Sequence, residues 1–580
     1  MRKLAIASLA LSCLLAAPAC KEPDPNKFET HIEKLKDPGK RAGAMADLER
    51  LVKAVASSPD SKARLDEFAQ KVVPVFVEIW DEAKEQHDGM LQVLIAAGHP
   101  GGCPVWEKAL AGIDGSDEAR KEALLALEGI KKSKSRPCAK AVVDALSKLI
   151  DDPKFDKGKE EGRLRLEMVE ALGALRDPAA VPVLIKAMEQ TKENQPVAVH
   201  RAAATALGNI GDPAAVDALI TVTFRVPDTP STSDIGNRSK TALVAIGKPA
   251  IPRVLEMLRG KHEEVNKLAA EHGVDLQIVK NTAAGILGAM GAKDAVEELV
   301  AFMPQDDCGE KPAAETDPDQ AALRAIVAQA LGFIGDERGV DALCSCVHAT
   351  HNPGDMWPIV EALGRIGGAK ATECLVGVLE RGEYDPEFLT NSDFRYEVRW
   401  EGARFAILAA SPEELPKVET AIAAQTDPKV KEKIAQWQPG IDVVKKCKAD
   451  KACYLGVLKD TSAHWFAREK AAVELARLAK GDVAVATEIA KAFKVRSPDA
   501  RVTMALLPPA MLEGKSCGAC VDAYENVLKA EKGTMSAKMQ LPVLVARYAM
   551  AKLRPNAAEE QKGAAKAGGD VEAGGDAKAG

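Results

Sequence analysis

The chain has 580 residues, of which 46% are hydrophobic, 28% charged and only 4% aromatic, and its formal net charge is −7. This balance excludes a membrane-embedded or largely disordered chain and favours a helical protein rich in small apolar residues. The acidic charge also argues against a nucleic-acid binder, which needs a concentrated basic face. The densest basic run, Lys131 to Arg136, is expected to be a solvated loop.

The N-terminal residues predict export. Arg2 and Lys3 precede an apolar run from Leu4 to Ala17, and small residues stand directly before Cys20. A short basic stretch, an apolar core and small residues at the cut are typical of a secretory signal. Residues 1–19 are therefore expected to be a signal peptide. No later segment has the 18 consecutive apolar residues that favour a membrane-spanning helix.

The residues around Cys20 resemble the cleavage box of bacterial lipoproteins. The resemblance implies that Cys20 becomes the lipidated first residue. Residues 20–27 are expected to form a short tether. Lys21 in second place suggests, by the same resemblance, an outer-membrane lipoprotein that faces the periplasm or the cell surface. An ordinary signal peptide cut near Ala19 is the alternative.

Further along, the chain repeats itself. Residues 171–188 are "ALGALRDPAAVPVLIKAM" and residues 206–223 are "ALGNIGDPAAVDALITVT". Each copy has two apolar stripes at helical spacing, separated by an Asp-Pro pair that favours the start of a second helix. Weaker copies begin at Ala242, Ile286, Ala330 and Ala362. The two longest spacings contain insertions, at 261–280 and 306–320. Such a period predicts stacked helix pairs.

The wording of these copies resembles HEAT-like repeats of the type named after phycobilisome lyases, over roughly residues 163–379. The resemblance implies an all-α fold, an α-solenoid of stacked antiparallel helix pairs that forms one extended superhelix. We expect degenerate helical repeats at 28–160, HEAT-like repeats at 161–380 and further degenerate repeats at 381–554. The tail at 555–580 lacks an apolar stripe and is expected to be disordered.

Export makes the cysteines informative. Ten remain after signal removal and lipidation, and an even number in an oxidising compartment predicts disulfides. They are Cys103, Cys138, Cys308, Cys344, Cys346, Cys374, Cys447, Cys453, Cys517 and Cys520. Cys103 and Cys138 lie one repeat apart and could meet across neighbouring repeats. Cys447 and Cys453 flank a short turn and predict a local staple. The pairing of the four in the middle of the chain stays open.

Two cysteine clusters allow other chemistry. Cys344, His348 and His351 are spaced i, i+4 and i+7, so a continuing helix would place three metal-capable side chains on one face. The competing interpretation is a bridged cysteine beside two surface histidines. Cys517 and Cys520 form a Cys-x-x-Cys ahead of a helix, whose amides could lower a thiol pKa. A redox role would be expected on a βαβ scaffold. This helical repeat chain is not such a scaffold, so a structural staple is favoured here.

One stretch is unusually rich in aromatic residues. Residues 394–405, "FRYEVRWEGARF", contain four aromatic residues and three arginines. Such side chains dominate interface hot spots. The candidate contacts for a partner are Phe394, Tyr396, Arg399, Trp400 and Arg404. The alternative is that they form the core side of a first helix.

Taken together, these patterns predict an exported, lipid-anchored HEAT-repeat scaffold or adaptor that binds unidentified proteins of the cell envelope. We expect no catalysis, no cofactor and no nucleic-acid partner. The alternative is a metal-binding or enzymatic protein that uses Cys344, His348 and His351.

Overall fold

The computed structural model describes residues 24–113, 116–151, 159–190, 196–225, 234–304, 308, 318–349, 353–381, 394–531 and 539–555. Within these ranges the regular structure is helical and contains no strand, which confirms the predicted all-α class. The expected signal peptide, the expected lipidation site Cys20 and the expected tail beyond Pro555 lie outside the described residues.

The chain divides into two compact units, Met1–Val183 and Leu184–Gly580, with the division inside helix α10. The helices that precede the division are α1 (Phe28–Lys36), α2 (Arg41–Ala56), α3 (Ser61–Lys71), α4 (Val73–Ile79), α5 (His87–Ala97), α6 (Cys103–Ala111), α7 (Asp117–Ser133), α8 (Ala139–Asp151) and α9 (Lys159–Leu175).

The second unit is also built from successive helices, which differ in length. Its helices are α10 (Val181–Glu189), α11 (Val197–Ile210), α12 (Val216–Arg225), α13 (Asp234–Ile246), α14 (Ile251–Leu258), α15 (Glu263–His272), α16 (Leu276–Met290), α17 (Val296–Phe302), α18 (Pro318–Ile334), α19 (Val340–Ala349), α20 (Pro353–Ile366), α21 (Gly368–Glu380), α22 (Phe394–Ala409), α23 (Leu415–Ala423), α24 (Pro428–Ala435), α25 (Gln438–Cys447), α26 (Lys451–Lys459), α27 (Trp465–Leu478), α28 (Val483–Lys491), α29 (Pro498–Leu512), α30 (Gly518–Ala530) and α31 (Gln540–Leu553).

The Asp-Pro pairs separate the two helices of a repeat, as the sequence predicts. The side chain of Asp177 accepts a hydrogen bond from the amide of Ala179, and Asp212 does the same for Ala214, each at 2.9 Å. Each pair opens a short 3-10 turn that leads into the second helix. Gly211 ends α11 with φ at 75°, a left-handed conformation that glycine adopts without steric cost.

Close contacts at glycine residues set the spacing between the first helix of one repeat and the first helix of the next. A β-carbon at Gly208 on α11 would lie 2.7 Å from the Cα of Ala242 on α13. A β-carbon at Gly288 on α16 would lie 2.5 Å from the Cα of Ala330 on α18. Gly332 on α18 faces α20 in the same way. The glycine of the repeated Ala-Leu-Gly wording is therefore the residue that lets each first helix approach the next.

The first unit shows the same two-row arrangement. Helices α2, α5, α7 and α9 pack in succession, and α4, α6 and α8 form a second row. Trp106 on α6 is fully buried, and a β-carbon at Gly129 on α7 would lie 2.8 Å from its ring. Here too a glycine makes room for a large neighbouring side chain, so the degenerate repeats also have a glycine at a close contact between helices.

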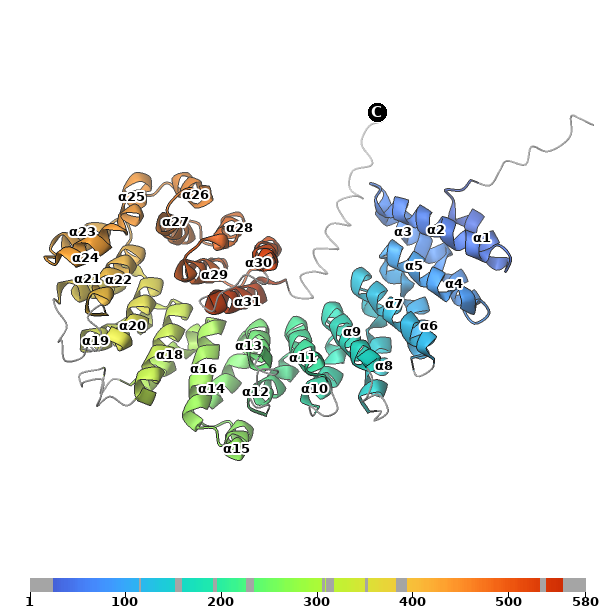
Figure 1. Ribbon diagram of the computed structural model, residues 1–580, viewed down its shortest axis with the longest axis horizontal. Helices are drawn as coiled ribbons and strands as arrows, with labels where there is room; N and C mark the ends of the chain where they lie inside the picture. Colours follow the sequence, from blue (N-terminus) through green and yellow to red (C-terminus); the bar gives the residue numbers. More distant parts are fainter. Residues whose placement is uncertain are drawn as a thin grey trace, which may run out of the picture. The chain divides into compact units, whose positions relative to one another are not determined.

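In the second unit the last described helix, α31, packs against helices near the start of the same unit. Helices α16, α18, α20 and α22 form a row in which each helix packs on the next. The row continues with α25, α27, α29 and α31. Helix α31 then packs against α13 and α16 (Figure 1). Buried Tyr548 contacts a cluster with Val244 and Ala289, and the guanidinium of Arg554 donates to the side chain of Asn209 at 2.7 Å. The solenoid fold is confirmed, but this unit is closed rather than an open, extended run.

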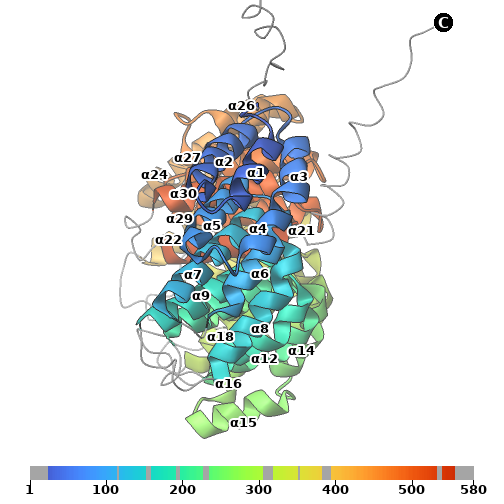
Figure 2. The same ribbon diagram turned by 90° about the vertical axis from the view of Figure 1, so that its right-hand side faces the viewer.

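The insertion predicted at residues 261–280 forms α15 and the first turn of α16. Helix α15 stands away from the row of first helices in both views (Figure 1, Figure 2) and packs against α12 and α16. His262 caps its start, with Nδ1 accepting from the amide of Val265 at 3.4 Å. Leu276 and Ile278 directly after α15 are exposed. Among the described helices, none has the length and apolarity needed to cross a membrane.

Candidate functional site

The predicted partner patch lies on α22. The side chains of Phe394 and Tyr396 lie outside the described set. Arg399 is 5% exposed and Arg404 only 1%, so neither can serve as a surface contact in this arrangement. These two arginines lie in the core here because α22 packs against several neighbouring helices, and a role in partner binding stays a prediction. Trp400 is partly exposed.

Arg404 lies where α22, α27 and α29 meet. Its guanidinium donates to Glu469 at 3.0 Å, to Asp499 at 3.2 Å and to Glu401 at 3.4 Å. The aromatic rings of Phe405 and Trp465 lie 4.8 and 5.1 Å from the guanidinium carbon. Burial lowers the pKa of Arg404, but the three carboxylates outweigh it and raise the pKa above its ordinary value. The cluster is a buried ionic contact in which Nη1 and Nη2 of the guanidinium pair with three carboxylates.

A second buried ionic contact lies beside the first. The ammonium of Lys470 donates to the carbonyls of Leu408 and Ala410, at the end of α22, and pairs with Glu474 at 2.6 Å. Burial lowers the pKa of Lys470 to about 8. These bonds satisfy carbonyls that the helix end leaves without intrahelical partners. Both charged clusters therefore connect helices.

The structure pairs all ten predicted disulfide cysteines. The expected partners Cys103 and Cys138 meet across neighbouring helices, and Cys447 meets Cys453 across a turn. The remaining pairs, which the sequence left open, are Cys308–Cys346, Cys344–Cys374 and Cys517–Cys520. Disulfide formation stays a prediction, which thiol counting on denatured, unreduced protein tests.

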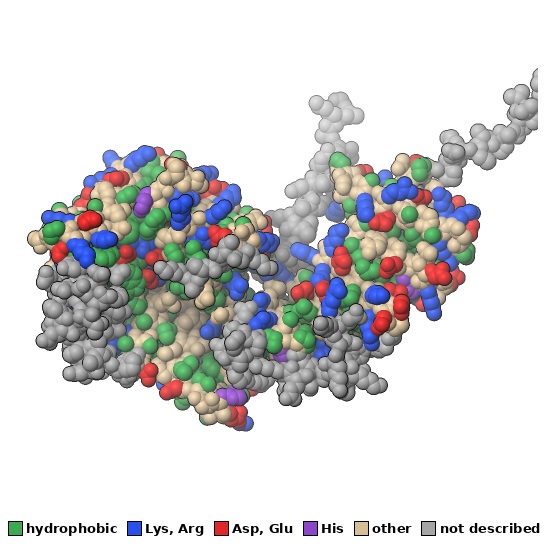
Figure 3. Space-filling model, viewed as in Figure 1, with side chains coloured by type: hydrophobic (Ala, Val, Ile, Leu, Met, Phe, Trp, Pro, Cys, Tyr) green, Lys and Arg blue, Asp and Glu red, His purple; other side chains and the backbone are tan. Residues whose placement is uncertain are grey.

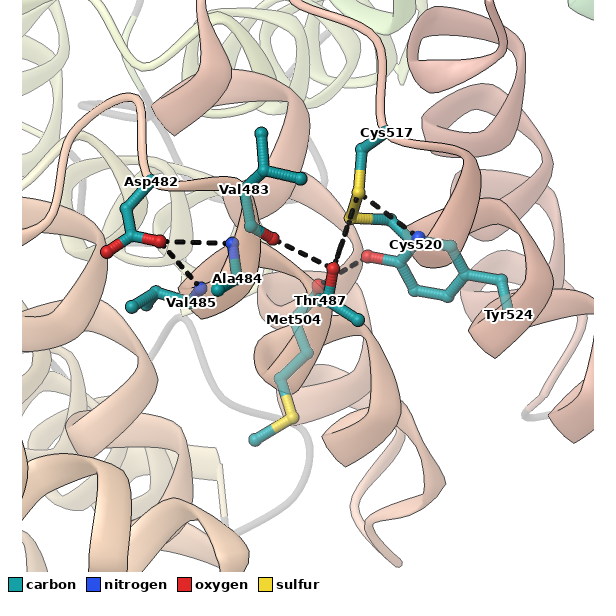
Figure 4. Close-up of a disulfide and its surroundings, with 9 residues drawn as sticks. All are labelled: Asp482, Val483, Ala484, Val485, Thr487, Met504, Cys517, Cys520 and Tyr524. Carbon is teal, nitrogen blue, oxygen red and sulfur yellow. Dashed lines mark hydrogen bonds between the residues drawn. A yellow bond between two sulfur atoms is a disulfide. The ribbon is translucent and has the colours of Figure 1, made fainter. Parts of the chain in front are cut away.

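The Cys517–Cys520 pair stands at the start of α30 (Figure 4). Cys517 Sγ accepts from the amide of Cys520 at 3.1 Å, and Thr487 Oγ1 lies 3.6 and 3.7 Å from the two sulfurs. The amide of Cys517 donates to the carbonyl of Leu553 at 2.7 Å. Both sulfur-bearing residues are buried. The surroundings therefore favour a local staple at the start of α30, and the amide of Cys517 links this start to the end of α31.

The structure brings together a metal-capable group that differs from the predicted one. Cys344, His348 and Cys374 place one ligand atom each within 4.8 Å of the others. His351 lies outside the described residues. Sequence spacing indicated Cys344 and His348, but Cys374 lies on the next repeat and only the stacking of α19 on α21 reveals it. Partial desolvation and the nearby Arg381 lower the pKa of His348.

A charged cleft lies at the base of α15. It is lined by three cationic and three anionic residues, Arg253, Arg259, Lys261, Glu256, Glu263 and Glu264. Because three cations oppose three anions, the cleft carries no formal charge excess that would select a charged ligand. The sequence did not indicate this cleft, because its members come from the end of α14 and from the insertion.

Comparison with known proteins supports the repeat assignment. A family model described as HEAT repeats matches residues 156–224 and 311–387. The fold and these two matches define an α-solenoid protein that carries HEAT repeats. The finer likeness to the phycobilisome-lyase type is not supported. A search of curated proteins found no match.

Similar solved structures include the crystal structure of Kap121p, at 12% identity and a TM-score of 0.26, covering 90% of this chain and 67% of that chain. Another is the karyopherin Kap121p bound to the SUMO protease Ulp1p, at 13% identity and a TM-score of 0.25, covering 90% of this chain. This chain spans 66% of the length of that second structure. These low scores carry no argument about function.

Proposed function

We propose that this protein is a lipid-anchored HEAT-repeat scaffold that binds protein partners in the bacterial cell envelope and performs no chemistry itself. The proposed address is the outer membrane, with the solenoid facing the periplasm or the cell surface. The observation that carries the binding role is the fixed helix spacing set by Gly208, Gly288 and Gly332. A rigid array presents its surface with little ordering cost on association.

The charge distribution favours a protein partner over a nucleic acid. Lys and Arg side chains are interspersed with Asp and Glu on the face seen in Figure 3, with apolar side chains between them. A nucleic-acid interface would need basic side chains gathered on one face to displace phosphate counterions. Mixed polar and apolar surface is the usual composition of a protein interface.

The membrane anchor rests on Cys20. Acyl chains on this residue would supply the membrane affinity, because stable anchoring needs more than one lipid chain and a diacylated, N-acylated cysteine carries several. Cys20→Ala is expected to leave unprocessed precursor or to move the protein out of the detergent phase on phase separation. If the variant partitions as the wild-type protein does, the anchor is wrong.

Partner binding is tested by chemical crosslinking in intact cells, followed by isolation of the tagged protein from membranes. The background control is the leader and tether, residues 1–27, fused to an unrelated soluble domain. The proposal expects a reproducible set of proteins above this background. It further expects Gly288→Val to lose them, because that change disturbs helix spacing, and Gly285→Val on the open face of the same helix to keep them.

Two results would contradict the scaffold role. One is recovery no greater than that of the fused control. The other is equal recovery in the Gly288→Val and Gly285→Val proteins when hydrogen exchange shows that only the first has altered packing between α16 and α18. Binding would then not depend on the helical array.

A further inference from the structure

A histidine and two cysteines lie close together on helices α19 and α21 of the second unit. Cys344 and His348 stand one helical turn apart on α19, and Cys374 stands on the adjacent α21. Cys374 Sγ lies 3.7 Å from His348 Nε2, and the Cα atoms of the two cysteines are 5.7 Å apart. Among the described residues, this is the only group of three metal-capable side chains with such close ligand atoms.

The packing around His348 leaves room for its ring at this place. A β-carbon at Gly377 on α21 would lie 2.6 Å from His348 Cε1. The glycine therefore allows the imidazole to lie against α21, beside Cys374. His348 is exposed, Cys344 is partly exposed and Cys374 is buried. An ion could reach the group from solvent on the side of His348.

We propose that Cys344, His348 and Cys374 form a redox-dependent metal site, which binds Zn²⁺ or a similar thiophilic ion when the Cys344–Cys374 disulfide is open. Opening requires a dithiol reductant such as a thioredoxin-like protein. The reductant passes two electrons and two protons to the disulfide and becomes a disulfide itself. Binding of the ion then releases the two thiol protons, because thiolates are the ligands.

The ligand set suits this ion. Two thiolates and one neutral imidazole are usual zinc ligands, and three protein ligands leave a fourth position for water. In a tetrahedral site with ordinary zinc distances, sulfur and nitrogen lie ~3.6 Å apart. The observed distance of 3.7 Å from Cys374 Sγ to His348 Nε2 is already close to this sulfur–nitrogen distance. The two sulfurs, which are bonded to each other in the oxidised protein, must separate before both can bind the ion.

The test uses full-length protein reduced under native conditions by a trialkylphosphine, which takes oxygen from water as it converts the disulfide to two thiols. Co²⁺ is then added, and thiolate-to-cobalt charge transfer and visible tetrahedral bands are recorded. The proposal expects these bands in reduced but not in oxidised protein, and expects Zn²⁺ to displace Co²⁺. If reduction abolishes helicity, the folded chain cannot hold the site and the proposal is overturned.

Matched variants decide which side chains bind. Cys344→Ser with Cys374→Ser should remove the tightest cobalt site, whereas Cys308→Ser with Cys346→Ser should retain it, because no histidine joins that pair. His348→Ala should weaken affinity by more than the roughly 10- to 100-fold loss typical of an outer-shell change. The matched histidine control is His272→Ala, an exposed residue at the end of α15, which should change nothing.

Gly377→Ala provides a test that keeps all three ligands. The added methyl group should displace the imidazole of His348 from α21 and weaken metal binding while the oxidised chain still forms its disulfide, as counted by free thiols. Unchanged cobalt affinity in both His348→Ala and Gly377→Ala would overturn the role of the histidine. Equal binding by the Cys344→Ser, Cys374→Ser protein would overturn the site itself.

Discussion

At the residue scale, Arg404 shows what a sequence pattern can and cannot indicate. Its helix was predictable from local spacing. Its burial was not, because its partners Glu469 and Asp499 come 65 and 95 residues later in the chain. Only the packing of α27 and α29 against α22 brings the three side chains together. A cluster of aromatic residues and arginines is thus compatible with an interface or with a core, and here the structure makes it core.

Replacing Arg404 is expected to be costly. Arg404→Ala leaves the fully buried Glu469 carboxylate without its cation, which should lower the free energy of unfolding by ~3–5 kcal/mol. The double variant Arg404→Met, Glu469→Gln should recover most of this loss, because no charge is then left buried alone. Urea unfolding followed by circular dichroism measures both. Lys433→Ala, at an exposed residue over the Trp400 ring, is the control and should cost little.

The account of Arg404 fails if Arg404→Ala costs no more than Lys433→Ala. That result would mean that the guanidinium is exposed in solution, as the partner-patch hypothesis requires.

Lys552 on α31 is predicted to make stability depend on pH. Burial lowers its pKa to about 8, so the folded protein loses this proton at lower pH than the unfolded chain, whose lysines titrate near ~10.4. Below pH 8 the native state therefore carries the cost of a desolvated ammonium, and this cost falls as pH rises from about 8 to about 10. Lys552→Met should raise the thermal midpoint at pH 7, with a gain of roughly 1–3 kcal/mol.

The gain from Lys552→Met should shrink steadily when the melts are repeated up to pH 10. The exposed Lys480→Met is the matched control and should show no such trend. A gain from Lys552→Met that is the same at pH 7 and pH 10 would contradict burial of the ammonium.

At the element scale, the sequence predicted most of what repeats. The helix pairs, the Asp-Pro turns and the insertion before α16 follow from apolar spacing and turn chemistry, which are local properties. The purpose of the repeated glycine did not follow, because its contact is with the next repeat. Where the wording departs from glycine, at Val244 on α13, the side chain packs against Tyr548 of α31 instead. The reason for valine in place of glycine could not be predicted from the sequence, because α13 and α31 are far apart in the chain.

The glycine contacts predict opposite effects for two substitutions on α16. Gly288→Ala should destabilise the protein by ~1–3 kcal/mol, because its methyl group meets the backbone of Ala330. Gly285→Ala has open space and should be neutral or stabilising by ~0.5–1 kcal/mol, since alanine favours helix. Thermal unfolding of the two proteins side by side measures the difference. Equal midpoints would contradict the role assigned to glycine in helix spacing.

At the scale of the whole molecule, the sequence predicted a solenoid but not its closure. Solenoid stability is a sum over neighbouring repeats, so a repeat pattern carries no information about contacts between distant repeats. The closure depends on α31, a helix without the Ala-Leu-Gly wording, and on the bond between Arg554 and Asn209, which are 345 residues apart. A closed unit cannot unwind from that end without first losing these contacts.

The closure of the second unit, together with the helix spacing set by the glycines, is what holds the proposed binding surface fixed, and hydrogen exchange tests this closure most directly. Exchange of the amides of α13 and α16 should be compared in the wild-type protein, in Tyr548→Ala and in Leu541→Ala, an exposed position on the same helix. We expect Tyr548→Ala to speed exchange in α13 and α16, with α5 and α7 of the first unit unchanged, and Leu541→Ala to match the wild-type protein. Wild-type exchange rates in α13 and α16 of Tyr548→Ala would contradict the closed unit.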